Sequence, residues 1–156
     1  MSAGLLNRRG ALLAAAALPL LARPARAAVL PVAHDLRDEL ASALARRQPL
    51  VVMVSLEGCP FCKVARDLYL EPLHREDGVP VAQVDMRTRT RVQDFRGATV
   101  THDDLARAWK IRIAPTVLFF GRGGAEVAER LVGGYIPDFY GAYLNQRLEQ
   151  ARAALR

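Results

Sequence analysis

The chain has 156 residues, of which 51% are hydrophobic and 24% are charged, and its formal net charge at pH 7 is +6. This length favours a single domain with a core large enough to fold without covalent cross-links. The composition is that of a globular chain rather than a disordered or collagen-like one. The chain contains two cysteines, which excludes a disulfide-dense scaffold and a zinc or iron–sulfur site with four thiolates from one chain.

Residues 1–27 predict a secretory signal peptide that is cleaved from the mature chain. The pair Arg8-Arg9 precedes an apolar run over 11–22, and the small-residue motif Ala-Arg-Ala over 25–27 marks the cleavage site at its end. A membrane anchor is the alternative interpretation. The apolar run, however, is 12 residues long and contains Pro19, whereas a spanning helix needs about 20 residues.

The arginine pair is followed by Gly-Ala-Leu-Leu, which resembles a twin-arginine export signal except that an aromatic residue usually stands in the place of Ala11. We expect a mature domain over 28–156 in the periplasm, with no stable membrane anchor after cleavage. Removing 1–27 takes away four arginines and no acidic residue, so 18 basic and 16 acidic side chains remain, a net charge of +2. This balance does not favour nucleic-acid binding, which needs a clustered basic face. The nearest cluster, Arg87, Arg89, Arg91 and Arg96, is expected to lie in a solvated loop.

The first half of the mature chain predicts a helix, a strand and a second helix. Residues 34–47 place leucines at helical spacing, and the run LVVMVSL over 50–56 is typical of a strand covered on both faces. Residues 60–71 predict a helix with Pro60 in its first position, and Pro72 is expected to end or to kink it. The inward stripe of this helix is predicted to contain Phe61, Val64, Ala65 and Leu68.

The second half predicts a hairpin and two more helices. Thr101 and Asp104 form a capping-box pattern before one of them. In chain order, the predicted elements are a strand over 79–85, a polar loop over 86–100, a helix over 102–110, a strand over 116–120, its hairpin partner over 125–132 and a helix over 138–153. The last helix is expected to bury Phe139, Tyr143, Leu144 and Leu148, and solvent-facing positions are expected for His74 and His102.

Strands and helices that alternate along a chain require parallel pairing with helical crossovers, and the hairpin adds antiparallel pairing. The sequence therefore predicts an α/β fold in which helices flank a central mixed sheet of about four strands.

Both cysteines lie in one motif, Cys59-Pro60-Phe61-Cys62, between a predicted buried strand and a predicted helix. This spacing at a helix start is typical of a redox site. The first N–H groups of the helix and its dipole favour an anion at Cys59, which raises the population of the reactive thiolate. Cys62 lies one turn further on, so it can resolve a mixed disulfide between Cys59 and a substrate.

Other interpretations of the pair are weaker on physical grounds. A structural disulfide that closes so short a loop removes little chain entropy. A c-type haem would need a histidine after Cys62, where Lys63 stands. A metal site needs more ligands than two thiolates, and His34, His74 and His102 are scattered, so no metal is expected. A Cu(I)-handling thiol module stays open as an alternative, because soft thiolates suit that ion, and so does a pure interaction domain.

A second motif is Ile111-Arg112-Ile113-Ala114-Pro115-Thr116, in which Pro115 lies 53 positions after Cys62. With the cysteine motif it resembles the thioredoxin superfamily, whose members read Ile-Arg-x-x-Pro-Thr here, and the resemblance covers 34–152, including Gly133-Gly134. It implies a thioredoxin-like fold in which Pro115 is cis and lies opposite the cysteines. It also implies that the backbone of Ala114 pairs with the substrate. We expect Pro60 and Phe61 to take part in substrate binding as well.

Two features depart from the cytoplasmic thioredoxins. Met53 stands where they place a buried aspartate, which leaves Glu57 as the nearby carboxylate and a weak candidate for the proton acceptor of the second cysteine. Pro60-Phe61 replaces their Gly-Pro, and a proline at the first spacer position is similar to glutaredoxins. Gly133-Gly134 with Asp138 is similar to the glutathione site of that family. A glutathione-linked enzyme is therefore the second interpretation.

The best overall resemblance is to exported bacterial thioredoxin-like proteins, including those that accompany sulfur-oxidation systems, whose hairpins end in a pair like Gly134-Tyr135. It implies an exported thiol–disulfide oxidoreductase whose redox-active pair Cys59-Cys62 acts on protein substrates. We expect a periplasmic reductant that receives electrons from a membrane thiol donor. We also expect a monomer without a bound cofactor, because the dithiol itself carries the two electrons. The sequence leaves the direction of electron flow open.

Overall fold

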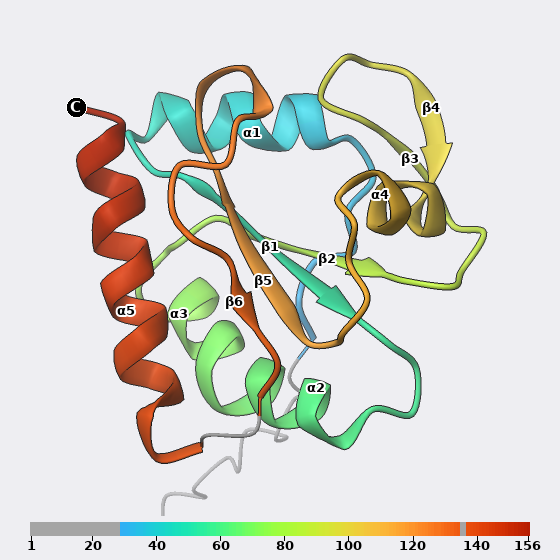
Figure 1. Ribbon diagram of the computed structural model, residues 1–156. Coiled ribbons are helices and arrows are strands. Elements are labelled where there is room, and N and C mark those ends of the chain that lie inside the picture. Colours follow the sequence, from blue (N-terminus) through green and yellow to red (C-terminus); the bar gives the residue numbers. More distant parts are fainter. Residues whose placement is uncertain (1–28, 135–136) are drawn as a thin grey trace, which may run out of the picture.

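The computed structural model describes residues 29–134 and 137–156, so the predicted signal peptide over 1–27 lies outside the described residues. A four-stranded sheet forms its centre (Figure 1) and consists of β1 (Leu50–Ser55), β2 (Val81–Asp85), β5 (Thr116–Phe120) and β6 (Leu131–Val132). The strand order is β2-β1-β5-β6, with β1 parallel to β2 and antiparallel to β5, and β6 antiparallel to β5. The predicted α/β fold with a mixed sheet is confirmed.

Helices cover both faces of this sheet. They are α1 (Leu36–Ala45), α2 (Pro60–Ala65), the π-helical η1 (Arg66–Leu70), α3 (Glu71–Arg75), α4 (His102–Ala108), the 3₁₀ turn η2 (Arg122–Gly124) and α5 (Pro137–Ala154). α1 and α4 pack on one face, and α2, α3 and α5 pack on the other. Successive residues of β1 point to opposite faces, so Val52 and Val54 enter the first core while Val51 and Met53 enter the second.

None of the helices within 29–134 and 137–156 combines the length and the hydropathy that a membrane crossing needs.

The capping-box pattern predicted before the fourth helix is confirmed. The hydroxyl of Thr101 accepts a hydrogen bond from the backbone N–H of Asp104 (3.1 Å), and the carboxylate of Asp104 accepts one from the backbone N–H of Thr101 (3.0 Å). Two N–H groups at the start of α4 are therefore satisfied by side chains.

Pro72 was predicted to end or to kink the second helix, and an end at this residue is wrong. The chain stays helical to Arg75, because α2 passes into the π-helical η1 and then into α3, where Pro72 lies in the first turn. The backbone N–H of Glu71 donates to the carbonyl of Arg66, five residues earlier. This wider turn accommodates a proline ring that would clash with the carbonyl four residues before it in a regular α-helix.

Two segments between the main elements also differ from the prediction. The polar loop over 86–100 contains a short hairpin of β3 (Arg91–Gln93) and β4 (Thr99–Thr101), in which Val92 faces Val100. The four arginines of this region are exposed, as expected. The strand predicted over 125–132 shrinks to β6, because Glu126 forms only an isolated bridge with Phe120.

The predicted buried stripes are partly wrong. In the helix after the cysteines, Phe61 and Leu68 are exposed and Val64 is only half-buried, while Ala65 is buried as predicted. In α5, Leu144 and Leu148 are buried as predicted, but Phe139 and Tyr143 are exposed and Tyr140 takes the inward position. The residues that a helix buries depend on how the helix packs against the sheet. The spacing of apolar residues alone does not determine this packing.

The expectation that both histidines face solvent is wrong for His102 and holds only in part for His74. His102 is fully buried; its Nδ1 accepts a hydrogen bond from the backbone N–H of Asp85 (3.0 Å), and its Nε2 donates to the carbonyl of Ala33 (2.9 Å). His74 is half-buried, and its Nδ1 lies 2.8 Å from the carbonyl oxygen of Val79. Buried imidazoles require such partners, and these partners come from other segments of the chain.

Candidate active site

The cysteine pair lies where β1 passes into α2. Gly58 adopts a φ of +71° in the connecting turn, a conformation that favours glycine. Cys59 is the N-cap of α2, and its Sγ accepts a hydrogen bond from the backbone N–H of Cys62 (3.1 Å). Pro60 occupies the first helical position, where its missing N–H costs nothing. The helix start thus directs an N–H group at the first sulfur, as the sequence predicts.

The two cysteines form a disulfide, and their Cα atoms are 5.3 Å apart. Their environments differ. Cys59 is half-buried, whereas Cys62 is 1% exposed and belongs to the core between the sheet and α2. An incoming reagent can therefore approach the sulfur of Cys59, while Cys62 is shielded by the protein.

The proline segment meets the cysteines from the other side. The Ala114–Pro115 peptide bond is cis, and the carbonyl oxygen of Ala114 lies 3.8 Å from the Sγ of Cys59. Pro115 is buried, and its carbonyl accepts a hydrogen bond from the backbone N–H of Gly133 (2.8 Å). Ala114 is half-buried and Ile113 is 54% exposed, so this segment presents its backbone and an apolar side chain at the surface.

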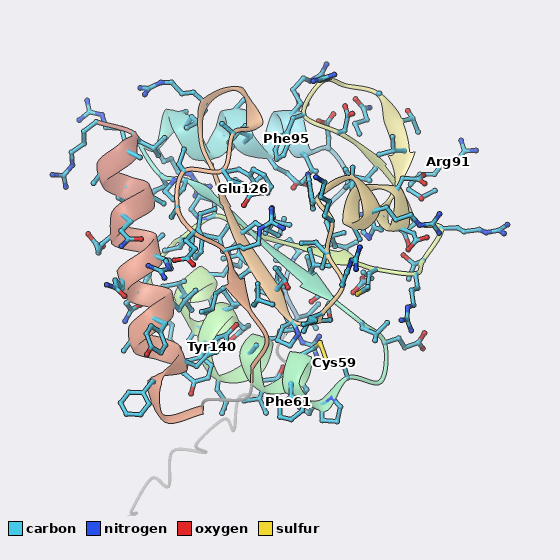
Figure 2. All side chains as sticks on the ribbon, viewed as in Figure 1. Cys59, Phe61, Arg91, Phe95, Glu126 and Tyr140 are labelled. Atoms are coloured by element: carbon cyan, nitrogen blue, oxygen red, sulfur yellow. A yellow bond between two sulfur atoms is a disulfide. The ribbon has the colours of Figure 1, made fainter. Side chains whose placement is uncertain are left out.

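An exposed apolar surface adjoins the disulfide. Phe61 is 53% exposed beside Cys59 (Figure 2). A Cβ atom added to Gly134 would lie 3.2 Å from Cγ of Pro115 and 3.4 Å from Cβ of Phe61. Gly134 therefore fits between these two residues because it has no side chain. The neighbouring Tyr135 of the predicted Gly-Tyr pair lies outside the described residues, and so does the side chain of Asp138.

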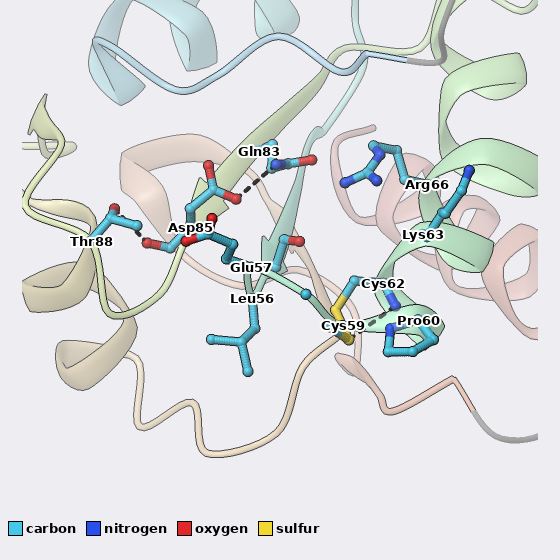
Figure 3. A pocket seen from close by; sticks show the side chains of 12 residues that line it. Leu56, Glu57, Cys59, Pro60, Cys62, Lys63, Arg66, Gln83, Asp85 and Thr88 are labelled. Carbon is cyan, nitrogen blue, oxygen red and sulfur yellow. Dashed lines mark hydrogen bonds between the residues drawn. A yellow bond between two sulfur atoms is a disulfide. The ribbon is translucent and has the colours of Figure 1, made fainter.

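A cavity of ≈ 660 Å³ opens on the other side of the disulfide, at the carboxyl ends of the parallel strands β1 and β2 (Figure 3). The cysteines line it together with Glu57, Lys63, Arg66, Gln83, Asp85 and Thr88, among others. Met53 is fully buried in β1, and Glu57 is exposed at the end of that strand.

Asp85 is a carboxylate of this cavity that the sequence prediction missed. One of its carboxylate oxygens accepts a hydrogen bond from the side-chain amide of Gln83 (2.7 Å), and Ser55 of β1 is its register partner. The ends of adjacent parallel strands meet at one edge of a sheet. The pairing of the strands over 50–56 and 79–85 was therefore the signal that could have placed Asp85 near the cysteines.

The cationic side chains near Cys62 are partly neutralised by one carboxylate. Lys63 and Arg66 both form ion pairs with Asp67. Burial raises the pKa of Asp67, but the hydrogen bonds and charges of Lys63 and Arg66 outweigh it, so its pKa lies below the ordinary value. Asp67 therefore stays ionised and offsets one of the two positive charges, so that a single net positive charge remains in this group of three residues.

Comparison with known proteins places the chain in a family. The family model described as a thioredoxin-like domain matches residues 36–148. No curated protein matches the chain at a significant level.

Solved structures with similar folds include a thioredoxin from Thermus thermophilus, with 25% identity, a TM-score of 0.51, and coverage of 78% of this chain and 87% of that one. They also include an oxidoreductase named DsbH, with 17% identity, a TM-score of 0.52, and coverage of 90% and 94%. The periplasmic thioredoxin SoxS from Paracoccus pantotrophus has 21% identity, a TM-score of 0.45, and coverage of 67% and 99%. The chain therefore belongs to the thioredoxin-like family, and the disulfide at the start of α2 makes it a thiol–disulfide oxidoreductase.

Proposed function

We propose that this chain is an exported thiol–disulfide oxidoreductase that reduces disulfides of protein substrates in the periplasm. The observation that carries the proposal is the asymmetry of the pair. Cys59 is half-buried at the helix start, next to the carbonyl of Ala114, while Cys62 is buried behind it. Such a pair suits a reaction in which one sulfur meets the substrate and the other completes the exchange.

In the reduced enzyme, Cys59 is the nucleophile. The N–H of Cys62 and the start of the helix stabilise its thiolate. The thiolate attacks one sulfur of the substrate disulfide, and the other substrate sulfur leaves as a thiolate. The product of this step is a mixed disulfide between Cys59 and the substrate.

Cys62 then resolves the mixed disulfide. Its thiol gives up a proton, and its sulfur attacks Cys59, so the second substrate sulfur leaves as a thiolate and takes up a proton. The two electrons have passed to the substrate, and the Cys59–Cys62 disulfide is restored. The proton of Cys62 leaves through the cavity beside it, where Glu57 and Asp85 offer carboxylates.

The substrate binds on the opposite side of the pair. An extended substrate segment pairs with the backbone of Ala114 in the manner of an added strand, and Pro115 fixes the position of this edge. Pro60 and Phe61 provide exposed contacts beside Cys59, and the exposed Phe61 suits an apolar residue of the substrate.

The cellular setting follows from the sequence. Residues 1–27 act as a cleaved signal that resembles the twin-arginine type, and 28–156 form the mature thioredoxin-like domain. A periplasmic reductant needs an electron supply, since its surroundings are oxidising, so we propose a membrane thiol donor as the partner that recharges the enzyme. The mature domain works as a monomer. Mass spectrometry of the periplasmic fraction tests export, because it should find a chain that begins at Ala28.

The redox role is tested by the equilibrium of the pair against glutathione. A potential near −270 mV, about that of thioredoxin, supports a reductant, whereas a value near −120 mV, about that of a strong oxidase, overturns that direction. Cys62→Ser should trap a mixed disulfide with a protein substrate, and Cys59→Ser should trap none. Glutathione-dependent activity that survives Cys62→Ser would favour the glutathione-linked enzyme instead.

A further inference from the structure

A second cavity, also of ≈ 660 Å³, lies at the opposite end of the sheet from the disulfide. It is lined by the end of α1 and the turn after it, by η2 and by the end of α5, which meet at the far end of the molecule from α2 (Figure 1). β1 has six residues, so roughly 17 Å of strand separates the two cavities. We call this second cavity the arginine cavity, and its lining residues are Leu44, Arg47, Gln48, Arg122, Arg152, Leu155 and Arg156.

The charged side chains that line the arginine cavity are all positive. Its lining holds four arginines and no carboxylate side chain. Arg152 forms an ion pair with Glu149. Within 29–134 and 137–156, Arg47, Arg122 and Arg156 form no ion pair with an acidic side chain. Three arginines from three separate segments thus line one cavity, and none of them is paired with an acidic side chain of the described residues.

Part of this arrangement is held in place by the fold. Nη1 of Arg122 donates to the carbonyl of Leu155 (3.1 Å), and Nε of Arg152 donates to the side-chain oxygen of Gln48 (2.9 Å). Arg47 adopts a φ of +56° just after α1, where glycine or asparagine is the usual residue. Hydrogen bonds therefore preset two arginines, and a third occupies a position that does not favour its residue type.

We propose that the arginine cavity binds a phosphate-bearing anion. Guanidinium groups match the geometry of phosphate oxygens, and a phosphate has enough oxygens to accept hydrogen bonds from several arginines at once. The cavity volume lies in the range of small-molecule sites, and Leu44 and Leu155 provide an apolar wall for an organic group attached to the phosphate. The same chemistry occurs in a soluble organic phosphate and in the headgroup region of an anionic phospholipid.

A purely structural role for these arginines is the competing explanation. α1 ends at Ala45 and α5 ends at Ala154, close to the cavity, and basic side chains stabilise the negative end of a helix. In that case the arginines would change the stability of the protein without creating a selective site for phosphate. The experiment has to separate these two roles.

The test compares two double variants of the full chain that lose the same charge. Arg47→Gln with Arg156→Gln removes two cavity arginines whose side chains form no hydrogen bond with the part of the chain that the structure describes. Arg89→Gln with Arg91→Gln removes two exposed arginines from the loop and hairpin after β2. Binding of phenyl phosphate is measured by calorimetry, and binding of vesicles with and without phosphatidylglycerol is measured by sedimentation. Both variants keep residues 1–28, so any difference between them comes from the arginines.

Saturable binding of phenyl phosphate or of phosphatidylglycerol vesicles by the wild type is expected, and the probe that binds identifies the source of the phosphate. The cavity variant should bind at least about tenfold more weakly, since each lost charge-assisted hydrogen bond costs about that factor, while the loop variant should stay within about twofold. The proposal would be overturned if the wild type showed no saturable binding, or if both variants lost the same binding affinity. It would also be overturned if chloride at matched ionic strength bound to the protein as well as the phosphate does.

A second measurement needs no variant. In the wild-type protein, the methyl NMR signals of Leu44 and Leu155 should shift on titration with phenyl phosphate, while those of Leu56, beside the disulfide, should not. Shifts at Leu56 instead would place the ligand in the other cavity and overturn the assignment. Thiol–disulfide activity should be unchanged in the cavity variant, which keeps this proposal independent of the function proposed for the cysteine pair.

Discussion

Replacement of the buried His102 should strongly lower the free energy of unfolding of the protein. Its imidazole joins three parts of the fold: α4, the end of β2 at Asp85, and the segment before α1 at Ala33. His102→Leu keeps a side chain of similar volume but removes both hydrogen bonds. The variant therefore measures the bonds rather than a cavity.

The expected loss can be worked out from these contacts. The variant leaves the N–H of Asp85 and the carbonyl of Ala33 without a partner in the core. Each unsatisfied buried group costs about 1–3 kcal/mol, so His102→Leu should lower the free energy of unfolding by about 2–6 kcal/mol. That is a large part of the 5–15 kcal/mol typical of a small domain.

Urea unfolding of the oxidised protein provides the assay, with the fluorescence of Trp109 as the signal. At a slope of about 1–3 kcal/mol per molar urea, the midpoint should fall by roughly 2 M. His34 is exposed, so His34→Ala is a matched control and should change the free energy of unfolding by less than about 0.5 kcal/mol. A loss below 1 kcal/mol for His102→Leu would refute the argument, because the two backbone groups would then have found other partners.

Three further outcomes follow from the structure. Hydrogen bonds from the hydroxyl and backbone of Thr101 hold the pKa of Asp104 below its ordinary value. The ionised carboxylate therefore stabilises the fold at a pH above its unfolded pKa, and this stabilisation is lost as the pH falls through the lower folded pKa. In Asp104→Asn, the free energy of unfolding should depend less on pH in that range, which acid unfolding measures. Asp85→Asn should slow the resolving step by about 10²-fold near neutral pH if it accepts the proton of Cys62, and stopped-flow decay of the mixed disulfide measures this; a larger effect of Glu57→Gln would assign the role to Glu57. Gly134→Val should raise KM for a protein disulfide several-fold more than Gly134→Ala does, because its larger side chain meets the proline and the phenylalanine; equal KM values would contradict this.

The sequence was sufficient for the parts of the fold that have one strong local cause. The apolar run of β1 and the capping box of α4 each depend on residues that are close in the chain, and both are found where they were predicted. The family model and the disulfide agree with the resemblance drawn from Cys59-Cys62 and the segment before Thr116. Local spacing and composition carry such signals well.

The features that the sequence analysis missed depend on contacts between segments that are distant in the chain. His102 was expected in solvent because nothing near it in the sequence could bind it, yet its partners are Asp85 and Ala33. Asp85 was missed at the site because its approach to the cysteines requires the pairing of β1 with β2. The arginine cavity combines residues from three segments, none of which is basic enough to be noticed alone.

The π-helical turn of η1 divides the helix after the cysteines into two parts, α2 and α3, whose registers differ by one residue. Cys62 and Ala65 face the core before it, and Leu70 and Leu73 face the core after it. The step from Ala65 to Leu70 spans five residues, one more than an α-helical turn allows. The extra residue in this turn sets the register between the two parts, so that both of them face the same core cluster. A deletion within 66–70 would therefore rotate one end against the other by about 100°, so that the anchoring leucines and the buried sulfur could no longer face the same sheet.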